Sequence, residues 1–109
     1  MRKHDGDLMQ FEIATGRGLM FRKEIGDPLL FVLNKGKNVS RWKASIHSLF
    51  VTLPFSAIWV DQDNRIVDIR ICKPFTSLVV PKKDPAYLIE GDVELAKDLK
   101  IGDRFELEG

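Results

Sequence analysis

Two side chains in this sequence carry groups suited to acid–base chemistry, metal binding or nucleophilic attack: His47 and Cys72. His47 is the only histidine outside the N-terminal tail, and it alternates with Leu49, Val51 and Leu53, which places it on an apolar strand face. An imidazole there could serve as an acid, a base or a ligand. We favour a histidine at the edge of the core that bonds to backbone, because no second histidine or carboxylate lies at a useful spacing.

Cys72 lies between Ile71 and Lys73, so a lysine ammonium could lower the thiol pKa and make the sulfur reactive. A free cysteine is more often a small buried hydrophobe, and we favour that interpretation. A Cys72–His47 pair acting as nucleophile and base would require the strands that carry them to be adjacent. Catalysis stays open, and a small enzyme that uses His47 or Cys72 is the last of our three hypotheses.

The preferred hypothesis is a non-catalytic module that binds a small anionic ligand or a protein partner. Basic groups lie around the first expected helix and at the end of the central hairpin, where they could rim a curved sheet surface. The residues proposed for this rim are Arg17, Arg22, His47 and Lys73. We expect no cofactor, no catalytic residue and no membrane partner.

A second basic stretch supports an alternative, a single-stranded nucleic-acid-binding protein. Trp42 is flanked by Lys35, Lys37, Arg41 and Lys43, and an aromatic ring among positive charges is what such proteins use. The overall charge argues against it. Residues 1–48 carry nine basic and five acidic side chains, residues 49–109 carry eight and eleven, and the net charge is only +1.

Neither of two short motifs predicts a metal or nucleotide site. Asp61, Asp63 and Asn64 resemble the start of a calcium loop, but Ile66 and Cys72 stand where that loop needs glycine and glutamate. The glycines at 16 and 18 lack the third glycine and the strand-to-helix setting of a phosphate-binding loop. A hairpin turn explains the acids at 61–64 better.

Length and composition predict one domain in a reducing compartment. The chain has 109 residues, which we divide into a flexible tail, residues 1–7, and a single domain, residues 8–109. One cysteine excludes an internal disulfide, and no apolar run approaches membrane-spanning length. The first residues have no signal-peptide core, so we expect a cytoplasmic protein.

A β-hairpin over residues 55–71 organises the predicted fold. Residues 55–60 are apolar on both parities except at Ser56, as in a central strand covered on both faces. Residues 61–64 form the turn. Residues 66–71 alternate, so we expect a packed face with Val67, Ile69 and Ile71 and a wet face with Ile66, Asp68 and Arg70.

The remaining pattern predicts further strands over residues 8–13, 29–33, 46–53, 78–80 and 86–90, a last strand around 105–107, and short helices within 15–23 and 93–99. A polar loop is expected at 34–38. The fold class is therefore mainly β, a β-dominated α+β domain with a single strongly curved sheet or small β-barrel of about seven strands and two short helices. The expected core is Met20, Phe31, Phe55, Trp59, Ile69, Leu95 and Phe105.

The order of motifs along nearly the whole chain resembles the uncharacterised DUF192 family, in the variant form of archaeal-type members. The matching stretches are residues 18–22 (GLMFR), 30–33 (LFVL), Pro54 before 58–61 (IWVD), 65–67 (RIV) and 101–103 (IGD). Residues 46–51 (IHSLFV) depart from the Phe-Trp-Met-Lys-Asn-Thr run of many members. The resemblance implies a compact, mostly-β fold, and it brings no established activity, substrate or catalytic residue.

Overall fold

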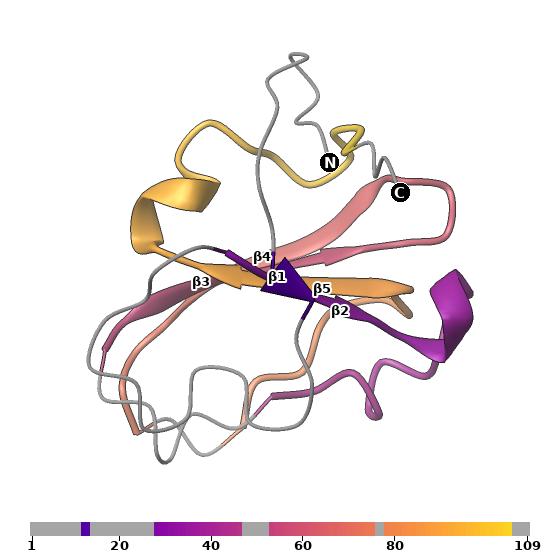
Figure 1. The fold of residues 1–109 in the computed structure, drawn as a ribbon, viewed down its shortest axis with the longest axis horizontal. Coiled ribbons are helices and arrows are strands. Elements are labelled where there is room, and N and C mark those ends of the chain that lie inside the picture. Colours follow the sequence, from indigo (N-terminus) through magenta and orange to yellow (C-terminus); the bar gives the residue numbers. More distant parts are fainter. Residues whose placement is uncertain (1–11, 14–27, 47–52, 76–77, 106–109) are drawn as a thin grey trace.

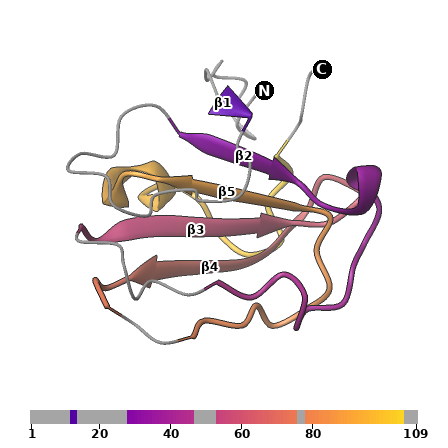
Figure 2. The same ribbon diagram turned by 60° about the horizontal axis from the view of Figure 1, so that its bottom comes forward.

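The computed structural model of the protein describes residues 12–13, 28–46, 53–75 and 78–105, and their centre is one sheet. Its strands follow the order β1-β2-β5-β3-β4 (Figures 1 and 2). β1 runs parallel to β2, and every other neighbouring pair is antiparallel. The strands are β1 (Glu12–Ile13), β2 (Leu29–Val32), β3 (Phe55–Val60), β4 (Ile66–Cys72) and β5 (Tyr87–Gly91).

The β-dominated class is confirmed, but the barrel alternative is wrong for the described residues. Their sheet is open, with β1 and β4 at its two ends, and it has five strands rather than about seven. Two short 3₁₀ helices accompany it: η1 (Asn34–Gly36), where a loop was expected, and η2 (Val93–Ala96), inside the stretch predicted as helix. No helix in this part of the chain is long and apolar enough to cross a membrane.

Other expectations fall outside the described residues. They are the helix over 15–23, all but the ends of the strand over 46–53, most of the strand over 8–13, the last strand beyond residue 105, and the core position Met20. Of the remaining core predictions, Phe55, Trp59, Leu95 and Phe105 are buried, as expected. Phe31 and Ile69 are partly buried and pack against the core rather than within it.

The hairpin of β3 and β4 is confirmed as the centre of the fold. β3 pairs with β4 on one side and β5 on the other, and all six of its residues are buried. Its turn is organised by Asp61, whose Oδ1 accepts hydrogen bonds from the backbone N–H groups of Asp63 and Arg65. Asn64 adopts the left-handed conformation, with φ of 63°. The acidic residues of this segment therefore build a turn, as predicted.

The expected division of β4 into a packed and a wet face is wrong at three positions. Ile66 and Asp68 are buried and Ile71 is exposed. The register shifts between Trp59 and Val60, where Trp59 pairs with Asp68 and Val60 with Ile66. This irregularity leaves Val67 unpaired and turns Val67 and Asp68 toward the same side, so simple alternation fails along this strand.

Both faces of the sheet are covered, which explains why β3 is apolar throughout (Figure 1). On the face that carries Phe55, Ala57 and Trp59, here called the Trp59 face, the core is completed from segments 39–46 and 78–86. Those segments run side by side, joined by paired backbone hydrogen bonds between Ile46 and Val79. On the opposite face, Ile58, Val60, Ile66 and Ile89 pack against Leu95, Leu99 and Phe105.

Replacing Trp59 with phenylalanine should weaken the attachment of segment 39–46 to the sheet. The buried indole Nε1–H donates a 2.9 Å hydrogen bond to the carbonyl of Ala44. Trp59→Phe leaves that carbonyl without its donor, which typically costs about 1–3 kcal/mol. Urea denaturation should show a loss of that size, whereas Trp42→Phe, at an exposed position, should leave the unfolding free energy within about 0.5 kcal/mol of wild type. Equal effects of the two variants would contradict this assignment.

Candidate functional site

The register of the sheet places an acid and a base in one line across the Trp59 face. Glu90 of β5 pairs with Leu29 of β2 on one side and with Ala57 of β3 on the other. Ala57 in turn pairs with Arg70 of β4. Directly paired residues project to the same face, so Glu90 and Arg70 flank a small alanine, two strands and about 10 Å apart at the backbone. We call Asp68, Arg70, Cys72 and Glu90 the polar cluster.

Glu90 is the least compensated member of this cluster. It is 7% exposed, and among the described residues no hydrogen bond or ion pair reaches its carboxyl group. Burial raises its pKa from an ordinary value near 4.5 to about 7. A buried carboxyl without a donor is costly whether it is charged or neutral, which marks the position as one that fold stability alone does not explain.

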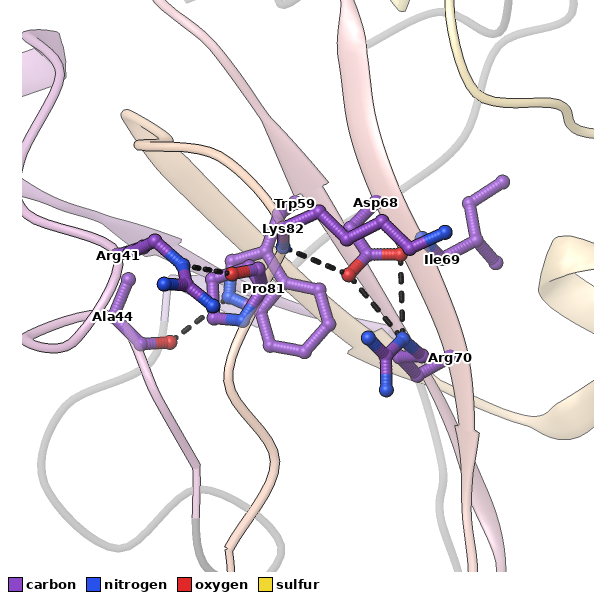
Figure 3. A network of polar contacts seen from close by, with 8 residues as sticks. All are labelled: Arg41, Ala44, Trp59, Asp68, Ile69, Arg70, Pro81 and Lys82. Atoms are coloured by element: carbon purple, nitrogen blue, oxygen red, sulfur yellow. Dashed lines mark hydrogen bonds and ion pairs between the residues drawn. The ribbon is translucent and has the colours of Figure 1, made fainter.

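Asp68 shows the opposite case, because its buried carboxylate is surrounded by donors (Figure 3). It is 1% exposed and accepts hydrogen bonds from the backbone N–H groups of Ile69, at 2.8 Å, and Lys82, at 3.0 Å. The Nε of Arg70 lies 3.2 Å from its Oδ2 and 3.4 Å from its Oδ1. Asp68 therefore joins β4 to the loop that begins at Pro81 and fixes the Arg70 side chain.

Arg70 is left with binding capacity after this pairing. Its bond to Asp68 uses Nε, and among the described residues no hydrogen bond or ion pair engages its two terminal nitrogens. The side chain is 41% exposed. A guanidinium held at Nε with its terminal nitrogens open can bind a carboxylate or phosphate with two parallel hydrogen bonds.

Cys72 is a buried thiol at the end of β4, where it pairs with Phe55. Burial, and to a smaller degree the negative charge of Glu90, raise its pKa to about 12, and the positive charge of Arg70 only partly opposes them. The prediction that Lys73 could lower this pKa is therefore wrong, since burial dominates. The thiol stays protonated at neutral pH, which confirms the interpretation of Cys72 as a small buried hydrophobe and removes support for a cysteine nucleophile.

The predicted anion-binding rim is described at one position. Lys73 is exposed directly after β4, whereas Arg17, Arg22 and His47 lie outside the described residues. Their gathering around one site therefore stays a prediction. Among the residues that the structure describes, no group of three or more histidine, cysteine, aspartate or glutamate side chains could hold a metal ion.

The structure divides the residues predicted for nucleic-acid binding into two groups. Arg41, Trp42 and Lys43 form a turn beside the loop at 81–84, to which Arg41 is bonded twice. Lys35 and Lys37 belong to η1 and the residue after it, a segment joined to the β3–β4 turn by two hydrogen bonds between Asn38 and Gln62. Lys35 has a left-handed backbone conformation, with φ of 59°.

Sequence reasoning missed Glu90, Asp68, Lys82 and Lys83. A lone acid inside the apolar stretch at 86–91 was an available signal for Glu90, because a charged residue in a strand covered on both faces needs a reason. Asp68 was assigned to the wet face, because the register shift in β4 leaves no mark in the sequence. The two lysines are recognised only when the loop at 81–84 is placed beside Trp42.

The raised pKa of Glu90 predicts a specific dependence of stability on pH. Between about pH 4.5 and pH 7, the Glu90 carboxyl group is protonated in the folded protein and ionised in the unfolded chain. The free energy of unfolding should therefore fall as pH rises through that window, by about 3 kcal/mol in total for this group. Glu90→Gln stays neutral, so its stability relative to wild type should increase by about that amount between pH 4 and pH 8.

Urea denaturation of both proteins at pH 4, 6 and 8 measures this difference and cancels the titration of all other groups. Glu94→Gln, an exposed position on η2, is the matched control and should show a difference that is flat within about 0.5 kcal/mol. A flat difference for Glu90→Gln as well would show that Glu90 is hydrated or paired in solution.

Burial and a pKa near 12 predict that Cys72 resists thiol reagents in the folded protein. Labelling with a disulfide reagent at pH 8 should be at least about 100-fold slower than in 8 M urea, because the thiol must be both exposed and deprotonated to react. Rapid stoichiometric labelling of the native protein, with unchanged circular dichroism, would contradict the buried placement.

Comparison with known proteins gives a consistent family and no activity. The model of DUF192, described as "Uncharacterized ACR, COG1430", matches residues 4–107. A UPF0127 protein of Thermococcus kodakarensis is 39% identical over 78% of this chain, which spans only 52% of that relative. A UPF0127 protein of Pyrococcus abyssi is 36% identical over 86% of this chain and 78% of its own length.

A solved structure supports the same fold. A protein of unknown function from Novosphingobium aromaticivorans superposes with a TM-score of 0.75 at 24% identity, over 91% of this chain and 75% of that one. At that identity the likeness concerns the fold alone. With a family model that covers nearly all of the sequence and archaeal relatives above 30% identity, this chain belongs to the DUF192 family, whose function is unknown.

Proposed function

We propose that this protein is a non-catalytic binding module that recognises a small ligand at the polar cluster on the Trp59 face. The observation that carries the proposal is the buried carboxyl of Glu90, which no described residue satisfies. Groups of this kind are rare in native proteins and concentrate where a protein binds or reacts.

The chemistry of the cluster defines the ligand that would fit. Arg70 offers two terminal nitrogens to an anionic group, and Glu90 requires a hydrogen-bond donor. The register aligns the two residues on one face of the sheet, with the small, buried Ala57 between them. A molecule of about amino-acid size that carries a carboxylate at one end and an ammonium or amide N–H at the other would satisfy both groups.

Other parts of the site support recognition rather than catalysis. Asp68 is occupied by three donors from the protein, so it is a support for Arg70 and not a spare acid or base. Cys72 stays protonated and is not a nucleophile. The predicted rim residues Arg17, Arg22, His47 and Lys73 would extend the same anion preference, and a cytoplasmic location is part of the proposal.

A thermal-shift screen tests the proposal, because a ligand that binds only the folded state raises its melting temperature by mass action. The probes are the twenty amino acids, short dicarboxylates and inorganic phosphate, each at 10 mM. A compound with both an anionic group and an N–H donor should raise the midpoint by several degrees. Arg70→Met should abolish the shift, and Glu90→Gln should reduce it for compounds that carry an ammonium group.

Lys97→Met is the control, since it removes one exposed positive charge from the residue that follows η2. It should bind the same compound as wild type does. A shift that survives in both Arg70→Met and Glu90→Gln would place the ligand elsewhere on the protein. No shift across the panel would refute a small-ligand role and leave a protein partner as the remaining form of binding module.

A further inference from the structure

Two loops that are far apart in the sequence form one surface beside the Trp59 face. The N–H of Val39 donates to the carbonyl of Pro85 at 2.8 Å, and the N–H of Arg41 donates to Oδ1 of Asp84 at 2.7 Å. The Arg41 side chain adds a bond of 2.8 Å from Nε to the carbonyl of Pro81 (Figure 3). These three contacts hold segments 39–46 and 81–85 in a fixed arrangement.

Trp42 is exposed on this surface although its backbone is firmly held. Trp42 is 62% exposed. Its backbone N–H donates a hydrogen bond to Ser40 Oγ at 3.3 Å, and its backbone carbonyl accepts one from Ser45 Oγ at 2.7 Å. The Arg41 guanidinium lies 4.9 Å from the ring centroid and covers part of one side. A large aromatic ring is thus presented to solvent in a set orientation, which lowers the entropic cost of stacking on it.

The two segments that meet beside this ring are rich in positive charge. Segments 39–46 and 81–85 contain four cationic side chains and one anionic side chain, whereas the whole chain has a net charge of +1. The anionic one, Asp84, already accepts a bond from the Arg41 backbone. Among the described residues no ion pair engages the cationic side chains, which are Arg41, Lys43, Lys82 and Lys83.

We propose that this surface, named here the Trp42 surface and formed by Arg41, Trp42, Lys43 and Lys83, binds single-stranded nucleic acid. A base stacks on the open side of the Trp42 ring, and the lysines contact the phosphates on either side of it. Lys83 adds a positive charge from a second loop, whereas the Lys82 side chain extends away from Arg41, toward Ile69 (Figure 3). An unpaired base is required, because in a duplex the faces of the bases are stacked on one another.

The proposal is tested by fluorescence anisotropy with labelled 12-nucleotide oligothymidine and oligouridine, titrated with the full chain in 50 mM salt. Binding should weaken roughly 20-fold between 50 and 200 mM salt if three phosphates are contacted. Trp42→Ala should weaken binding about tenfold or more, and Trp42→Phe, which keeps a ring, should retain most of it. The oligonucleotide should also quench wild-type tryptophan fluorescence, and this quenching should disappear in Trp42→Ala.

A charge-matched pair of variants separates this surface from non-specific attraction. The double variant Lys43→Gln and Lys83→Gln should lose at least tenfold in affinity, whereas Lys97→Gln with Lys100→Gln removes the same charge from the segment after η2 and should lose less than threefold. Melting temperatures within about 2 °C of wild type would show that every variant is folded. Equal losses in both double variants, a preference for duplex, or no binding at 0.1 mM protein would each overturn the proposal.

Discussion

The structure depends on one constraint: β3 is hydrogen-bonded on both edges and buried on both faces. A strand in that position can hold almost no polar side chain, and its apolar surface must be covered by layers on both sides. η2 with the segment that follows it supplies one layer, and segments 39–46 and 78–86 supply the other (Figure 2). The indole of Trp59 fastens the second layer through its bond to Ala44.

Covering the Trp59 face has different consequences for the two acids that lie on it. Asp68 is placed where two backbone N–H groups and the Arg70 guanidinium converge, so its charge is compensated at every side. Glu90 lies two strands away in the next row, where no described donor reaches it and its pKa rises to about 7. Burial of a carboxylate is therefore tolerated at Asp68 and costly at Glu90. For this physical reason we treat Asp68 as a structural residue and propose a ligand-binding role for Glu90.

The sequence predicted those structural features that depend on neighbouring residues, and it missed those that depend on residues far apart in the chain. The apolar run at 55–60, the acidic turn after it and the alternation beyond it specify the hairpin from neighbouring residues alone, and the structure confirms it. The register shift at Trp59 and Val60 inverted the expected environment of Asp68. The alignment of Glu90 with Arg70 across Ala57 depends on β5 lying between β2 and β3, and strand order is a property of the whole sheet that no local pattern contains.

The two proposed sites share their support although they differ in chemistry. A continuous line of contacts runs from Arg70 through Asp68 to the backbone of Lys82, and from the adjacent Pro81 carbonyl to Arg41 (Figure 3). Pro81 is itself buried, so the loop between the sites is anchored rather than free. Asp68 therefore holds the Arg70 side chain directly, and it supports the Trp42 surface through the loop that contains Pro81 and Lys82. Because a rigid support transmits small displacements, the geometry of both proposed sites depends on the Asp68 carboxylate, which belongs to the polar cluster and supports the Trp42 surface from outside it.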